Sequence, residues 1–144
     1  MTTSPVPGII DAIIDALENS DDLEGVTIRS GPFDATGVRE VIELNEIIFE
    51  DEQSTMGTAN RQITFRVNGI IETLQFGAGE EVISAARTRA FALMDIVETV
   101  LVEGLSATGL AYAEISTGKY YGGVSDQGHI GHLEFTLRCI ADLG

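Results

Sequence analysis

Residues 61–103 read RQITFRVNGIIETLQF, then GAG, then EEVISAARTRAFALMDIVETVLVE, and this stretch decides the class of the fold. Residues 62–67 alternate between polar and apolar side chains, as a half-buried strand does. From Glu80 to Glu103 the apolar residues recur at helical spacing, and Gly104 follows as a stop signal. A β segment followed by a long amphipathic helix predicts a domain that combines sheet and helix.

The β segment contains Asn68-Gly69, a pair that is typical of the two-residue turn in a β-hairpin. Residues 61–76 therefore form either a hairpin that turns at this pair or one long strand that bends at the glycine. The local pattern does not choose between the two.

The flanking sequence extends this plan in both directions. We expect an N-terminal amphipathic helix that ends near residues 19–22, and strands at 26–29, 38–49, 110–117 and 130–141. Adjacent apolar pairs in the 38–49 stretch predict a β-bulge there, and the glycine-rich segment 120–128 predicts a loop. The prediction is a single domain, residues 1–144, of the α+β class: an antiparallel or mixed sheet with two α-helices packed on one face.

The composition and net charge of the chain exclude some classes of function. The 144 residues are 44% hydrophobic and carry a formal charge of −15, with thirteen acids and two bases in the first sixty residues. Such a surface repels phosphate backbones, so tight nucleic-acid binding is not expected. The N-terminus lacks the pattern of a secretory signal, and no apolar run approaches the roughly 18 residues of a membrane span. We therefore expect a soluble protein made without export. The lone Cys139 has no disulfide partner within the chain, which fits a reducing cytosolic origin.

No catalytic motif is evident. The Gly77-Ala78-Gly79 loop lies where a phosphate would bind, but Glu80-Glu81 follows it, and two carboxylates would repel an anion. His129 and His132 are three apart in a predicted strand, so they point to opposite faces and cannot share a metal. We therefore predict a protein that is not an enzyme and has no catalytic residues, metal or cofactor.

Three groups of residues are candidates for contacts with other subunits. The acidic run Glu50-Asp51-Glu52 lies in a predicted loop and is either a solvated loop or a docking element. Arg87 and Arg89 on the long helix either pair with acids of their own subunit or contact an acidic neighbour. Tyr120 and Tyr121 lie in the predicted glycine-rich loop, where they either cover the edge of the sheet or anchor an interface.

The order of these elements resembles the tail terminator proteins of long-tailed bacteriophages. The resemblance rests on the N-terminal helix and strand (residues 9–17 and 25–28), the central strand 63–67, the Ala-rich helix segment AARTRAFAL (residues 85–93) and the closing strands 110–117 and 130–141. It covers nearly the whole chain and consists of element order and composition, so it transfers no individual functional residues.

The resemblance implies a virion protein that assembles in the host cytoplasm into a ring, typically of six copies, at the head-proximal end of the tail tube. Its partners would be other copies of itself, the tail tube protein and the head–tail connector or stopper protein. The ring would end tube growth and join the tail to the head, and DNA would pass through it without specific binding. An acidic lining would favour that passage, because it repels phosphate.

Two alternatives remain open. The chain is another head–tail connector, neck or tail-tube protein, or it is a small-molecule-binding α+β domain. In the second case we expect a pocket between the long helix and the sheet, with Tyr112 or Glu114 reaching into it.

Overall fold

The computed structural model describes residues 5–30, 40–49, 53–54 and 61–142. Within these ranges the elements are, in chain order, α1 (Val6–Glu18), the short 3-10 helix η1 (Asp21–Leu23), β1 (Thr27–Ser30), β2 (Glu40–Phe49), β3 (Gln53–Ser54), β4 (Arg61–Phe76), α2 (Glu80–Glu103), α3 (Leu105–Thr108), β5 (Tyr112–Val124) and β6 (Gly128–Asp142).

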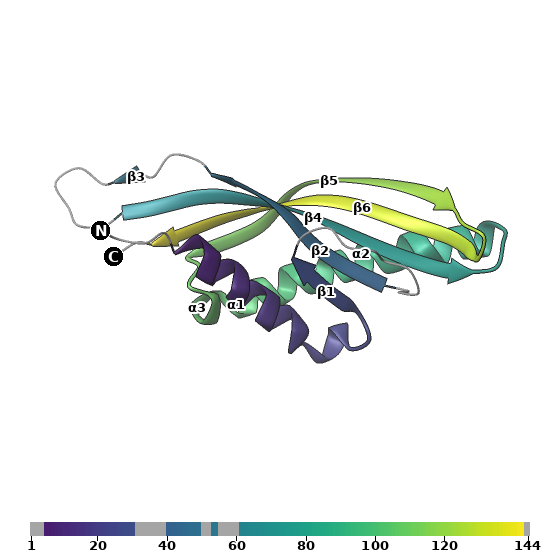
Figure 1. Cartoon of the computed structure of the whole chain (residues 1–144), viewed down its shortest axis with the longest axis horizontal. Helices are drawn as coiled ribbons and strands as arrows, with labels where there is room; N and C mark the ends of the chain where they lie inside the picture. Colours follow the sequence, from purple (N-terminus) through teal and green to yellow (C-terminus); the bar gives the residue numbers. More distant parts are fainter. Residues whose placement is uncertain (1–4, 31–39, 50–52, 55–60, 143–144) are drawn as a thin grey trace.

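The strands form one mixed sheet in the order β1-β2-β4-β6-β5, and β3 pairs with β4 beside this path. β1 runs parallel to β2, and the other pairs are antiparallel. Both long helices lie against the same face of the sheet (Figure 1), and no helix of the described residues covers the opposite face. The α+β class predicted from the sequence is confirmed.

The segment 61–76 is a single strand, not a hairpin. β4 pairs with β6 from Gln62 to Phe76 without a break at Asn68-Gly69. Gly69 serves a different purpose, because the ring of Phe135 on β6 occupies the space where a side chain at this position would lie. The bulge predicted in the preceding strand is present, between Leu44 and Glu46 of β2.

The predicted loop 120–128 is wrong for most of its length. β5 continues through Tyr120-Tyr121-Gly122-Gly123 to Val124, and the reversal is confined to the residues between Val124 and Gly128. Ser125 closes this turn: its amide donates to the Gly128 carbonyl at 2.8 Å, and its Oγ accepts from the amides of Gln127 and Gly128. The glycines remain in the strand because β6 offers a continuous partner.

The core lies between the helices and the sheet. Along α2, Ala86, Ala90, Leu93, Val97 and Leu101 are fully buried, at the helical spacing that the sequence predicts. α2 lies close to the sheet at Gly131, where an added side chain would meet the Ala86 carbonyl at 3.0 Å. Beside it, the buried Thr73 hydroxyl donates a hydrogen bond to the Ala86 carbonyl at 2.8 Å. These small and polar contacts set the position of α2 on the sheet.

Candidate interaction surfaces

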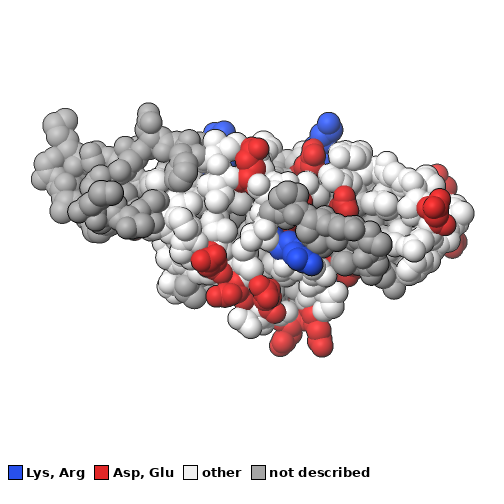
Figure 2. Space-filling model, in the orientation of Figure 1, with Lys and Arg blue, Asp and Glu red and all other residues white. Residues whose placement is uncertain are grey.

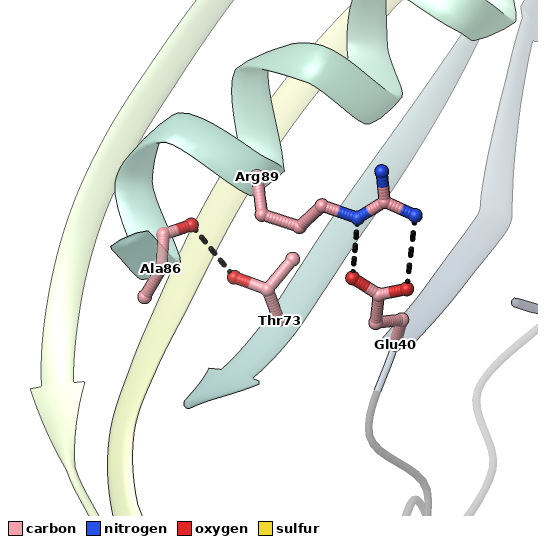
Figure 3. A network of polar contacts seen from close by, with 4 residues as sticks. All are labelled: Glu40, Thr73, Ala86 and Arg89. Carbon is pink, nitrogen blue, oxygen red and sulfur yellow. Dashed lines mark hydrogen bonds and ion pairs between the residues drawn. The ribbon is translucent and has the colours of Figure 1, made fainter. Parts of the chain in front are cut away.

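The two arginines of α2 have different roles. Arg89 binds Glu40 of β2 through two hydrogen bonds, from Nε at 2.6 Å and from Nη2 at 3.1 Å (Figure 3). The hydrogen bond to Glu40 raises the pKa of Arg89 above its ordinary value. Together with Thr73 and Ala86, this pair ties α2 to the neighbouring strands (Figure 3). Arg89 therefore takes the first of its two predicted roles, a partner within its own subunit.

Arg87 points elsewhere. It is exposed, and it forms no ion pair with any residue in the described part of the chain. Its positive charge acts on Tyr120: burial raises the pKa of that phenol, and the charge of Arg87 acts in the opposite direction. Arg87 thus remains available to a partner outside the subunit.

Tyr120 and Tyr121 belong to the edge strand β5 and point to opposite faces of the sheet. Tyr120 turns toward α2, where its ring centroid lies 5.7 Å from that of Phe91. Its hydroxyl is buried without a hydrogen-bond partner among the described residues. Tyr121 lies on the uncovered face and stacks on His132 at 4.4 Å. The pair therefore does not act as one aromatic loop.

An apolar groove runs between α2 and β5. It encloses about 320 Å³, and its lining includes Phe91, Met94, Ile115, Tyr120 and Leu133. Phe91 is 41% exposed at its wall. We name these five residues the α2–β5 groove. A pocket between the long helix and the sheet was expected from the sequence, but its lining residues were not, since its two walls come from elements that meet only in the folded chain.

At Ile115 a side chain of α2 occupies a backbone amide of the edge strand β5. Glu98 of α2 accepts a hydrogen bond from the Ile115 amide at 3.1 Å, beside the irregularity in the β5–β6 register between Ile115 and Thr117. A carboxylate in this position takes the donor that an added strand would use, so it opposes strand pairing there.

Exposed acidic side chains gather on α1 and around η1. Figure 2 shows them clustered over the region where Figure 1 places α1 and η1. We name this set the acidic helix face; its members, all exposed, are Asp11, Asp15, Glu18, Asp21, Asp22 and Glu24. No lysine or arginine occurs between residues 5 and 28 to balance them.

The uncovered face of the sheet carries a network of polar side chains. Its broad depression, about 410 Å³, includes Glu46, Asn68 and Thr136. These side chains bind one another: Asn68 donates to Glu46 at 2.8 Å, and Thr136 donates to Asn68 at 2.9 Å. Their hydrogen-bonding groups are largely used within the sheet.

Tyr112 and Glu114 do not reach a pocket between α2 and the sheet. Their register partners on β6 are Ile140 and Arg138, which places both on the uncovered face. There the Tyr112 hydroxyl donates to Glu114 at 2.6 Å, and Arg138 lies 3.8 Å from the same carboxylate. The sequence-based expectation for these two residues is wrong because it assumed the opposite strand face.

The two histidines lie on opposite faces of the sheet. His129 lies on the helix side of β6 and His132 on the uncovered side, where its Nδ1 lies 2.8 Å from Glu72. Across the described ranges, no three His, Cys, Asp or Glu residues cluster as metal ligands would. No described helix is long and apolar enough to cross a membrane. The run Glu50-Asp51-Glu52 lies outside the described residues.

No protein-family model matches this sequence, and no curated protein matches it significantly.

Proposed function

We propose that this chain is a tail terminator of a long-tailed bacteriophage. Identical subunits, six by the family resemblance, would form a ring that caps the head-proximal end of the tail tube, stops its growth and joins the head connector. The protein would act in the virion as a structural part and not as an enzyme. The proposal starts from the order of elements in the sequence, and features of the fold support it.

The observation that carries the proposal is the outer edge of β5. This strand is thirteen residues long, and among the described residues no other strand pairs with its outer side. It carries exposed Tyr121 and Val124, the latter 87% exposed. A long edge with exposed apolar side chains favours association with another chain.

The two edges of the subunit also differ, as a ring requires. A cyclic assembly of more than two copies joins one surface to a different surface of the next copy. Here the β5 edge borders an apolar groove, whereas the β1 edge lies beside α1 and its acidic helix face. Two copies can therefore meet through unlike surfaces.

Net charge supports the passage of DNA. Each copy carries −15, so a ring of several copies surrounds its channel with a strongly negative field. Such a field repels phosphates and opposes their arrest on the wall. A high-resolution map of the ring with a neutral or basic lining would contradict this part of the proposal.

The first test is the mass of the purified protein by light scattering across concentration, with and without millimolar magnesium to screen the charge. We expect a closed species near six times the 15.4 kDa of one chain. The functional test adds the protein to polymerising tail tube protein of the same virus. We expect shorter tubes that carry a ring at one end; tubes of unchanged length without rings would refute the proposal.

The small-molecule alternative makes a different prediction. A specific ligand would raise the melting temperature in a metabolite screen, because it binds the folded state alone. We expect no such shift. Tyr112 and Glu114, the residues expected to line a pocket for such a ligand, face away from α2.

A further inference from the structure

Asn68-Gly69 is the pair of residues in this chain that is chemically most prone to deamidation. The chain has four asparagines, and Asn68 is the only one that precedes a glycine. In deamidation, the backbone nitrogen of the following residue attacks Cγ of the asparagine. A side chain on that following residue hinders the attack, and glycine has none. Asn68 is therefore the asparagine that reacts first wherever the backbone is free to move.

The reaction needs only water. A bond forms between the Gly69 nitrogen and Cγ of Asn68, and the bond from Cγ to Nδ2 breaks. The Nδ2 nitrogen leaves as ammonia, taking the proton of the Gly69 amide. Water then opens the five-membered succinimide at one of its two carbonyls, which gives either aspartate or isoaspartate at residue 68.

The fold holds the backbone of this pair away from the reactive geometry. Both residues lie inside β4, which has β2 on one side and β6 on the other. Gly69 pairs with Leu44 on β2 and with Phe135 on β6. To close the succinimide ring, the Gly69 nitrogen must turn toward the Asn68 side chain, and the pair must leave both ladders to do so. Core strands of this kind separate only when much of the domain unfolds.

The side chain of Asn68 is held as well, but it is not shielded from water. Its Nδ2 donates a hydrogen bond to Glu46 at 2.8 Å, and its Oδ1 accepts one from Thr136 at 2.9 Å. These three residues line the depression of about 410 Å³ on the uncovered face, and Glu46 is exposed. The protection therefore comes from the paired backbone and not from the exclusion of water.

Each product conflicts with the sheet as it is observed. Aspartate at position 68 places a carboxylate oxygen where Nδ2 now lies, 2.8 Å from the Glu46 carboxylate, so repulsion replaces a hydrogen bond. Isoaspartate adds one carbon to the main chain before Gly69, so β4 cannot keep its register with both neighbours. Gly69 cannot shift to compensate, because the Phe135 ring fills the space beside it.

We infer that Asn68-Gly69 is a deamidation site that is closed in the folded sheet and open in the unfolded chain. Time spent unfolded converts part of the chains into a form that no longer builds this sheet. The missing side chain of Gly69 has two effects: it makes room for Phe135 in the folded state, and it speeds cyclisation in the unfolded state. This inference concerns a single chain, so it is independent of the proposed function.

Peptide mass spectrometry of the full-length chain tests the site. The protein is incubated in native buffer and in urea, at the same mildly alkaline pH and the same temperature. In urea we expect Asn68 to convert before Asn19 and Asn45. In native buffer we expect its conversion to be slower by about a thousandfold or more, as the folded-to-unfolded ratio of small domains requires. A native rate within about tenfold of the rate in urea would overturn the inference.

Two threonine variants distinguish protection by the backbone from protection by the side chain. Thr73→Val removes a buried hydrogen bond elsewhere in β4 and should raise the unfolded fraction about 5- to 30-fold, and we expect the native deamidation rate to rise by the same factor. Thr136→Val removes the bond to Asn68 itself. We expect its rate to follow its own unfolded fraction, measured by urea denaturation. A faster rate than that fraction allows would overturn the assignment of protection to the backbone.

Refolding tests the consequence for the chain. Wild-type chains that have partly deamidated in urea are diluted into native buffer, and a brief protease treatment then removes the chains that stay unfolded. We expect isoaspartate at position 68 to be depleted from the resistant chains. Chains that were unfolded only briefly are the control and should refold. An equal isoaspartate content before and after proteolysis would show that the modified chain folds normally and would overturn this part of the inference.

Discussion

The ring of Phe135 on β6 occupies the space that a side chain at Gly69 of β4 would need. The two residues are direct register partners on the helix side of the sheet. A Cβ at Gly69 would overlap three ring atoms of Phe135. Both positions are buried, and Phe135 is only 2% exposed. Glycine is required here by the volume of an aromatic ring, and not by a turn.

Substitution of Gly69 by alanine should therefore destabilise the fold by about 1–3 kcal/mol through overpacking. Chemical denaturation measures this value. Gly123→Ala in β5 is the control, since an added Cβ there meets nothing within 4 Å, and it should change stability by less than about 0.5 kcal/mol. The double variant Gly69→Ala/Phe135→Leu should recover part of the loss. Equal effects of the two alanine substitutions would contradict the packing argument.

The Gly69–Phe135 pair also explains why the sequence left the central strand ambiguous. Asn68-Gly69 is a valid local turn signal, and the reason for the glycine lies in a strand far along the chain. The same cause produced the error at residues 120–123: local glycines indicate a loop, but pairing with β6 holds the segment extended. α2, in contrast, was predicted with its observed bounds because its periodicity and its flanking glycines are local signals.

The roles of the candidate functional residues also depend on contacts between segments that are far apart in the sequence. Arg87 and Arg89 are equivalent in sequence, yet two residues differ by about 200° around a helix axis. Which of them meets Glu40 depends on the position of β2, and no local pattern contains that information. A pocket between the long helix and the sheet was expected, but the residues that line the α2–β5 groove were not, because they come from a helix and from a strand whose extent was misjudged.

Thr73 should contribute measurably to the docking of α2. Thr73→Val keeps the shape of the side chain but removes the buried hydrogen bond to the Ala86 carbonyl. We expect a loss of about 1–2 kcal/mol in the free energy of unfolding. Thr117→Val, at an exposed position on β5, is the matched control and should lie within about 0.5 kcal/mol of the wild type. A similar value for both variants would show that the hydrogen bond has no net effect.

We expect the two arginines of α2 to contribute different amounts to the free energy of unfolding. Arg89→Met leaves Glu40, whose side chain is 19% exposed, without its partner. Because the pair is partly solvated, we expect a moderate loss of about 1–2 kcal/mol. Arg87→Met should change stability by less than about 0.5 kcal/mol, since Arg87 has no ion pair with a described residue. Thermal and urea unfolding of both variants give the comparison, and a larger loss for Arg87→Met would refute the assignment.

Cys139 should couple stability to alkaline pH. Burial raises the pKa of its thiol from an ordinary value of 9.0 to about 12. The unfolded chain therefore loses the thiol proton near pH 9.0, while the folded chain keeps it. The stabilisation is complete below about pH 9 and declines as the pH rises toward about 12.

Urea unfolding at a series of pH values from about 8 to about 11 measures this decline. Tyr112 and Tyr120 also have raised pKa values, through a hydrogen bond to Glu114 and through burial respectively, so they contribute to the same slope. Cys139→Ala should reduce the slope without abolishing it, and the comparison of slopes is independent of the stability lost through the smaller side chain. In the folded wild type at about pH 8, a thiol reagent should label Cys139 only as fast as the chain opens. Rapid labelling of the folded protein, or an unchanged slope in Cys139→Ala, would contradict the burial argument.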